Sequence, residues 1–198
     1  MAYDADVPGK VIIAGSSVVN ADNKSSLKFT SKYGVKPALT VAGNKLLNLD
    51  TFTVEAFVKV VKIPRWSALF MKKRGGGLYS WLLQNNGNSG KIRVRVDSNP
   101  KDAKNKAGFN QGINTNFVIN DGKWHHVAVS YDALTQKLNI YGDHKLLVSR
   151  KTALPVIYDS EPLCFLGGTN AGVTEENIDE IRITDQVLLP ENFLKVKK

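Results

Sequence analysis

The chain has 198 residues, of which 42% are hydrophobic and 23% are charged. These proportions are typical of a globular chain, and an all-β sandwich of this length commonly forms a single domain. No apolar run of about 18 residues occurs, which excludes a helical membrane span. The first residues, MAYDADVPGK, lack the charged, apolar and small-residue segments of a signal peptide.

The net charge of +9 points to an anionic partner, but the basic residues are scattered. The densest groups are Lys72-Lys73-Arg74, a loop with Lys101, Lys104 and Lys106, and a tail with Lys195, Lys197 and Lys198. These groups do not alternate with aromatic residues, and the chain has no helix-turn-helix, zinc-finger or RNA-binding motif. A solvated basic surface is the simpler interpretation, so nucleic acid binding is not indicated.

The predicted elements are strands. Residues 1–26 are polar and irregular, and we interpret them as an arm or an added edge strand ahead of a domain at 27–198. The segment FTVEAFV at 52–58 alternates apolar residues on one face with Thr53, Glu55 and Phe57 on the other, which is the period of a strand. The same period recurs at 92–97, 127–130 and 180–183.

Glycine and asparagine runs separate these strands. They occur at Gly75-Gly76-Gly77, at 85–90, at Asp121-Gly122, at Gly142-Asp143 and at Gly167-Gly168. A long polar loop is expected from Asn99 to Asn116, and the best candidate for a helix is the short piece ENFLKV after Pro190. Many short strands with polar turns predict an all-β fold, a two-sheet antiparallel β-sandwich.

The single Cys164 excludes an internal disulfide. Its neighbours Leu163, Phe165 and Leu166 predict a small buried hydrophobic side chain rather than a reactive thiol.

Three phrases carry a family resemblance: FTVEAFVKV at 52–60, DGKWHHVAVSYD at 121–132 followed by LNIYGDHKLLV at 138–148, and NIDEIRITDQVLLPENF at 177–193. In order and spacing they resemble the laminin G-like jelly rolls of the concanavalin A-like lectin and glucanase superfamily, over roughly residues 27–194. The resemblance implies a jelly roll of two antiparallel sheets and a location outside the cell or on a particle surface. Lectins, adhesion modules and some polysaccharide-cleaving enzymes share that fold, so the fold alone does not select a function.

The adjacent histidines of WHHVAVSY could suggest a metal or catalytic site. If Val127 and Val129 face the core, His125 points to their side, and His126 points with Trp124 to the opposite face. Neighbouring histidines that diverge cannot both bind one metal ion. We therefore expect a packed tryptophan and two hydrogen-bonded imidazoles, and no metal site.

The acidic stretch EENIDE at 175–180 is the best candidate for a glycosidase centre. The resembling glucanases carry three carboxylates on one face of a strand, and retaining glycosidases need two carboxyl groups about 5 Å apart. Here Glu176 and Glu180 share a face with Ile178 between them, and Asp179 points away unless a bulge intervenes. We expect Glu180 to pair with Arg182 or another arginine. No nucleophile elbow, phosphate-binding loop or alginate-lyase motif is present, so we expect no catalytic residues.

Calcium is the one cofactor that the resemblance suggests. Such jelly rolls often hold Ca²⁺ at the rim through an F-D-G phrase and nearby acids. This chain has Phe29-Thr30-Ser31-Lys32 at that place, which removes a carboxylate and adds a cation. The first-strand motif therefore does not support a calcium site.

A ligand-binding surface is the remaining site hypothesis. Aromatic rings stack on sugar rings, and paired arginines bind a carboxylate or sulfate. The candidate ligand-binding residues are Arg93, Arg95, Tyr79, Trp81, Trp66 and Tyr141. The alternative is structural, with half-buried aromatic residues and cross-strand pairs to acids such as Glu55.

The preferred function is a non-catalytic recognition or adhesion module that binds a carbohydrate or cell-surface glycan, with acidic glycans favoured by the net charge. The alternative is a structural protein on a virion surface, a bacteriophage capsid decoration or tail component, with capsid or tail proteins as its partners. Such a protein needs no signal peptide, and residues 1–26 would serve as a docking arm. A polysaccharide hydrolase or lyase is the third hypothesis.

Overall fold

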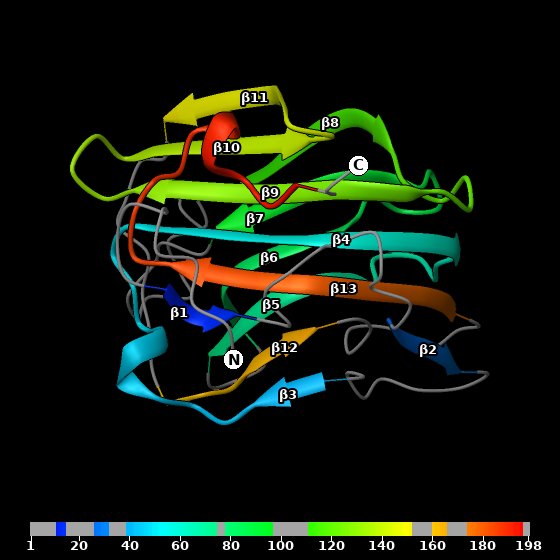
Figure 1. Ribbon diagram of the computed structural model, residues 1–198, viewed down its shortest axis with the longest axis horizontal. Coiled ribbons are helices and arrows are strands. Elements are labelled where there is room, and N and C mark those ends of the chain that lie inside the picture. The colour runs from blue at the N-terminus through cyan, green and yellow to red at the C-terminus, as the bar shows by residue number, and fades with distance from the viewer. Residues whose placement is uncertain are drawn as a thin grey trace.

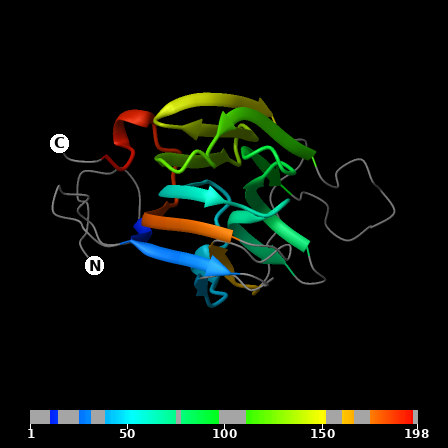
Figure 2. The same ribbon diagram turned by 90° about the vertical axis from the view of Figure 1, so that its right-hand side faces the viewer.

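The structure is a computed structural model that describes residues 11–14, 26–31, 39–74, 78–96, 111–151, 160–165 and 174–195. Two antiparallel sheets pack face to face, and Figure 2 shows these two layers edge on. This confirms the predicted all-β sandwich of the jelly-roll type. Most of the predicted arm 1–26, most of the loop 99–116 and the glycine turns at 75–77 and 167–168 lie outside the described residues.

Sheet A has seven strands in the order β1-β13-β4-β9-β10-β11, with β2 also paired to β13 (Figure 1). Its strands are β1 (Val11–Ala14), β2 (Leu27–Ser31), β4 (Phe52–Lys62), β9 (Trp124–Asp132), β10 (Lys137–Gly142), β11 (Lys145–Lys151) and β13 (Thr174–Thr184). The three phrases that carry the family resemblance form β4, β9 with β10 and β11, and β13.

Sheet B has six strands in the order β3-β12-β5-β6-β7-β8. Its strands are β3 (Leu39–Val41), β5 (Ala68–Arg74), β6 (Leu78–Asn85), β7 (Lys91–Val96), β8 (Gln111–Val118) and β12 (Leu163–Phe165). Helical structure in the described part of the chain is limited to two 3-10 turns, η1 (Lys45–Leu47) and η2 (Pro190–Asn192). The helix expected after Pro190 is therefore only one short turn.

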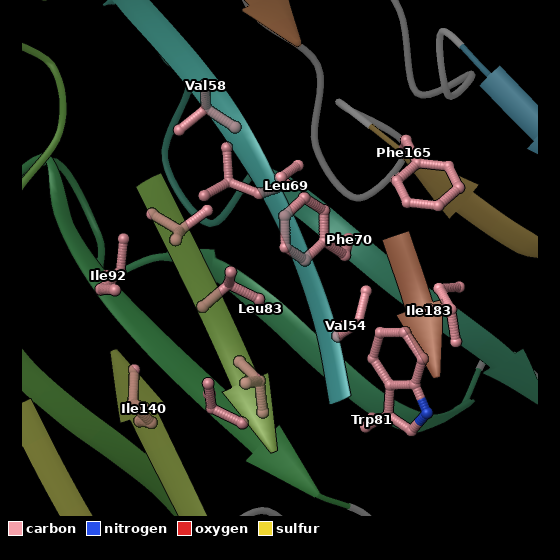
Figure 3. Packing of buried hydrophobic residues seen from close by; sticks show 14 of the residues in the cluster. Val54, Val58, Leu69, Phe70, Trp81, Leu83, Ile92, Ile140, Phe165 and Ile183 are labelled. Atoms are coloured by element: carbon pink, nitrogen blue, oxygen red, sulfur yellow. The ribbon is translucent and has the colours of Figure 1, made fainter. Parts of the chain in front are cut away.

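The main core lies between the sheets and follows the strand period (Figure 3). Val54, Ala56 and Val58 of β4 are all fully buried in it, as the alternation predicted. Leu69, Leu83 and Ile92 come from sheet B and face them across the interior. Because alternate residues of a strand point to opposite faces, the side chains between these core residues must face outward from the sandwich.

The outer face of sheet A is covered by residues 185–195, which we call the C-terminal strap. Figure 1 shows this segment, in red, crossing in front of β9 and β10. Leu188 and Phe193 of the strap pack with Ala128 and Tyr141 in a second apolar cluster. Thr53, Glu55 and Phe57, which face outward on β4, are consequently buried as well.

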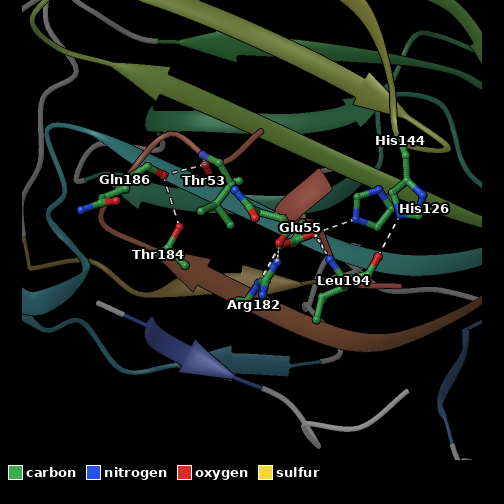
Figure 4. Close-up of polar contacts among 10 residues, drawn as sticks. Thr53, Glu55, His126, His144, Arg182, Thr184, Gln186 and Leu194 are labelled. Carbon is green, nitrogen blue, oxygen red and sulfur yellow. Dashed lines mark hydrogen bonds and ion pairs between the residues drawn. The ribbon is translucent and has the colours of Figure 1, made fainter. Parts of the chain in front are cut away.

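A polar network lies beneath the strap (Figure 4). The Arg182 Nε donates to Glu55 Oε1 at 2.6 Å, and its Nη2 donates to the Asn192 carbonyl oxygen at 2.6 Å. His126 Nε2 lies 2.7 Å from Glu55 Oε2, which also accepts from the Leu194 backbone N–H at 3.0 Å. His144 Nε2 donates to the Leu194 carbonyl oxygen at 2.8 Å. The network therefore bonds the strap to β4, to β13 and to the turn between β10 and β11, and His126 of β9 joins it through Glu55.

Candidate ligand-binding face

The outer face of sheet B is set by β7. Ile92 and Val94 belong to the core cluster, so Arg93 and Arg95 between them project to the opposite side. Both arginines are partly exposed. The structure thus confirms the prediction that Arg93 and Arg95 project together from one side of β7.

Arg93 lies beside Trp66, with its guanidinium carbon 5.3 Å from the centre of the indole ring. Its Nε atom is buried and makes no hydrogen bond with the residues that the structure describes. Among the described residues, no carboxylate pairs with this guanidinium. Burial lowers the pKa of Arg93, which is the direction expected when desolvation of a cation is not offset by a nearby negative charge.

Arg95 forms a second pair of the same kind, with its guanidinium 6.0 Å from the centre of the Tyr79 ring. Tyr79 also packs against a small apolar cluster on this face. The cluster consists of Ala68, Met71, Leu82 and Cys164. Cys164 is fully buried and burial raises the pKa of its thiol, which confirms the expected small hydrophobic side chain.

The sheet register places polar side chains beside Arg93. Gln84 of β6 and Asn114 of β8 are its direct partners on the two neighbouring strands. Directly paired residues share a face, so both amides lie on the same side of the sheet as the guanidinium. Asn114 is exposed and Gln84 is buried. Sequence reasoning missed both, because neither stands out without the register.

Gly112 of β8 was missed as well. It pairs with Arg95 in the register, and a Cβ atom added to it would overlap the Nε and Nη2 atoms of Arg93. The Arg93 guanidinium therefore lies directly over a position that has no side chain.

Two of the six candidate residues, Trp81 and Tyr141, are buried and do not lie on an exposed face. Trp81 is 4% exposed and stacks on Phe52 in the core, with 5.3 Å between the ring centres. Tyr141 is 5% exposed, because the strap covers it and Phe193 packs against its ring at 4.9 Å. Burial raises the pKa of Tyr141. Neither ring is available at the surface to stack on a sugar.

Trp66 remains on the candidate face. Its ring contacts two guanidiniums, Arg93 at 5.3 Å and Arg65 at 5.6 Å. Its backbone φ is 60°, in the left-handed region that a tryptophan rarely adopts. Since such strain tends to occur at functional sites, the geometry favours a role for Trp66 in holding Arg93 in place.

The histidine pair diverges as predicted. His125 contacts Asp121 and Asp143, each at 3.0 Å, and its ring meets the Phe117 ring edge-on. A backbone hydrogen bond from Lys123 and the contact with His125 hold the pKa of Asp121 below its usual value. His126 is buried on the other face against Glu55. Both imidazoles are hydrogen-bonded, but Trp124 is 43% exposed, so the expectation of a packed tryptophan was wrong.

The acidic stretch of β13 contains the bulge that the sequence left open. The register shifts between Asp179 and Arg182, and Glu180 has a φ of 50°. Glu176 and Glu180 are nevertheless buried, at 0% and 4% exposure. Neither carboxyl group is therefore presented at the surface. Arg182, one of the expected partners of Glu180, donates to the Glu55 carboxylate.

Within the described ranges, no three His, Cys, Asp or Glu side chains come together as a metal site. Lys32 of the altered calcium motif is outside those ranges, whereas Phe29 pairs with Glu176 in the sheet.

A family model described as the concanavalin A-like lectin/glucanases superfamily matches residues 34–192. The match covers most of the chain, and the protein therefore belongs to this superfamily. No curated protein matches the chain.

Solved structures with the same fold include two toxin binding domains. The binding domain of Paraclostridial Mosquitocidal Protein 1 has a TM-score of 0.64 and 12% identity, over 92% of this chain and 45% of that chain. The binding domain of Botulinum neurotoxin DC in complex with SialylT has a TM-score of 0.62 and 15% identity, over 96% of this chain and 46% of that chain. The protein thus spans less than half the length of these toxin domains.

A third similar structure is of single-domain size. The CBM40 of Ruminococcus gnavus IT-sialidase, bound to alpha2,3 sialyllactose, has a TM-score of 0.61 and 13% identity, over 82% of this chain and 92% of that chain. At these identities the three likenesses establish the fold. As for membranes, the part of the chain that the structure describes contains no helix long and apolar enough to span one.

Proposed function

We propose that the protein is a non-catalytic recognition module that binds a glycan through the outer face of sheet B. The observation that carries this proposal is the presence of two arginine–aromatic pairs on one accessible face, Arg93 with Trp66 and Arg95 with Tyr79. Amide, guanidinium and aromatic groups together supply the hydrogen bonds and apolar contacts that sugars need. Such a module would act where glycans are displayed, outside the cell or on a particle surface.

The two outer faces of the sandwich differ in what they offer a partner. The strap closes much of sheet A, and its buried polar groups bond to one another. Sheet B presents partly exposed arginines and the exposed Asn114 instead. This contrast favours sheet B as the binding face.

A binding role also suits the positions of the acidic residues. The candidate carboxyl groups of β13 are buried, which argues against a hydrolase that works on an extended polymer. The similar structures are described as a carbohydrate-bound CBM40 and as toxin binding domains. Those descriptions concern other proteins, and they support a binding function here by analogy of fold. No observation on the described residues specifically favours the virion hypothesis.

A glycan array tests this proposal with a variant that blocks the face. Asn114→Trp places a bulky side chain beside Arg93 at an exposed position, so folding should be retained. Ser149→Trp on β11 adds the same bulk to the other sheet and serves as the matched control. We expect the wild type and Ser149→Trp to retain the same glycans and Asn114→Trp to lose them. A wild-type protein that retains no glycan, or an Asn114→Trp variant that retains them all, would contradict the proposal.

A further inference from the structure

This inference rests on the proposed glycan-binding function and specifies its ligand. We infer that Arg93 is the anion-binding residue of the face, and that the glycan carries a carboxylate or sulfate group which accepts hydrogen bonds from the Arg93 guanidinium. The two anions share the chemistry that matters, two oxygen atoms spaced to accept from one planar guanidinium.

The first argument is the missing counter-charge. Arg93 is partly buried, and in the described part of the chain no carboxylate contacts it. A buried donor without an acceptor is costly, and protein structures rarely tolerate one without a reason. The unbonded Nε of Arg93 is such a donor. An external anion would offset both the charge and the lost hydration.

The second argument is the space prepared for the side chain. A Cβ atom at Gly112 would overlap the Arg93 guanidinium, so any residue other than glycine would displace it. Gly112 is the register partner of Arg95, whereas Arg93 is paired with Asn114. The Arg93 guanidinium therefore reaches diagonally from its own position towards Gly112 of β8. The side chain is thus positioned by the backbone of its neighbour and not left to move freely in solvent.

The third argument is the aromatic contact. The Trp66 ring attracts a cation through its π-face and leaves the N–H groups at the guanidinium edge free to donate. An arginine held in this way loses less side-chain entropy when it binds an oxyanion, because its orientation is already fixed.

Arg95 is the natural comparison within the site. It faces the same side two residues along β7, and its ring contact with Tyr79 is longer, at 6.0 Å against 5.3 Å for Arg93 and Trp66. We assign it a secondary role at the edge of the ligand. Asn114, the exposed register partner of Arg93 on β8, is placed to bond to a neighbouring sugar hydroxyl, whereas the buried Gln84 is not.

The experiment uses an array with four probe classes: heparan sulfate fragments, oligogalacturonates, sialylated lactoses, and neutral counterparts such as lactose and galactan. We expect retention of one or more acidic classes and weaker retention of the neutral ones. The sulfated and carboxylated arms then show which anion the site prefers. Arg93→Gln should weaken binding to the retained acidic glycan by about 10-fold or more, as for loss of a charge-assisted hydrogen bond.

Gly112→Ala provides an independent test that leaves the charge in place. The added methyl group displaces the flexible end of Arg93, so binding should fall as it does in Arg93→Gln while the unfolding midpoint stays near that of the wild type. Arg150→Gln, which removes one exposed positive charge from β11 of sheet A, is the control for net charge and should bind like the wild type.

The outcomes separate this inference from the proposed function. Retention of neutral glycans alone, or unchanged binding of acidic glycans by Arg93→Gln and Gly112→Ala, would overturn the inference and leave a glycan-binding module. An equal loss in Arg150→Gln would also overturn it, since general charge attraction would then explain the binding. Retention of no glycan by the wild type would overturn both.

Discussion

Each outer face of the sandwich carries an arginine that is at least partly buried, and the groups around the two arginines differ. Under the strap, Arg182 is 3% exposed and bonds to the Glu55 carboxylate and to a backbone carbonyl. On sheet B, Arg93 is only partly exposed, yet its contact is an indole ring and its Nε has no acceptor. Arg182 has an internal carboxylate partner, whereas no carboxylate within the described ranges pairs with Arg93.

This difference separates a structural site from a candidate binding site. A buried ion pair with completed hydrogen bonds contributes to a unique fold, but it has no capacity left for a ligand. The Arg93 guanidinium contacts a ring and lies over a glycine, and no carboxylate in the described part of the chain pairs with it, so it retains that capacity.

The largest expected loss of stability from a single substitution is on the outer face of sheet A, which the strap covers. Glu55→Gln removes the negative charge from the centre of the network and leaves Arg182 as an uncompensated buried cation. We expect a loss of about 3–5 kcal/mol in the free energy of unfolding, measured by urea denaturation. Glu191→Gln removes a carboxylate from the exposed part of the strap and should cost far less. Similar losses in the two variants would mean that the network is not the main attachment of the strap.

A smaller effect is expected at Thr53. Its hydroxyl donates to the Gln186 carbonyl oxygen at 2.7 Å and accepts from the Leu188 backbone N–H at 2.9 Å. Thr53→Val keeps the shape but leaves the Leu188 N–H without its acceptor and the Gln186 carbonyl oxygen with only the Thr184 hydroxyl at 3.2 Å. We expect a cost of about 1–3 kcal/mol in unfolding free energy. Thr53→Ser retains the hydroxyl and should recover most of that loss. If Thr53→Val has the same free energy of unfolding as the wild type, water must replace the hydroxyl at this site.

The closed face should also make stability depend on pH. Burial, with a contribution from nearby His126, holds the pKa of His144 below its usual value, although Glu55, Asp143 and the bond to Leu194 act in the opposite direction. The unfolded chain therefore binds the proton more readily, and stability rises with pH. The contribution of His144 is complete above a pH of about 6.5, the ordinary value, and is lost as the pH falls below it.

Urea denaturation at several pH values between about 7.5 and 5 measures this dependence. His144→Asn removes the titrating group, and asparagine tolerates the positive φ of 62° at this position. The variant should be less stable overall but should lose less stability on acidification. An identical pH dependence in both proteins would show that other groups cause it.

The sequence was sufficient for the features that depend on strand period. The inward residues of β4, the divergence of His125 and His126, and the outward projection of Arg93 and Arg95 all follow from alternation along one strand. The sequence could name a bulge in 175–180 only as a possibility, because two-fold alternation does not show where a strand gains an extra residue.

The missed features depend on parts of the chain far apart in sequence. Glu55 has the pattern of a solvent-facing residue, and the sequence offered a cross-strand arginine as its partner. The structure supplies Arg182 of β13 as that partner, and the strap that follows β13 covers the pair, which the strand period could not show. Tyr141 faces outward as expected but is covered by the same strap. In LYSWLLQN both strand faces carry apolar residues, so the period could not show that Trp81 points inward.

The smallest expected effect is the change in the free energy of unfolding caused by a substitution on the outer face of sheet B. Arg93→Gln removes a partly desolvated cation that has no carboxylate partner among the described residues, so little favourable electrostatic energy is lost with it. Its contact with Trp66 contributes modestly at a partly exposed site. We expect the free energy of unfolding to change by no more than about 1 kcal/mol, even where glycan binding falls by about 10-fold. A loss in stability comparable to that of Glu55→Gln would mean that Arg93 serves the fold, and the contrast between the two arginines would then be wrong.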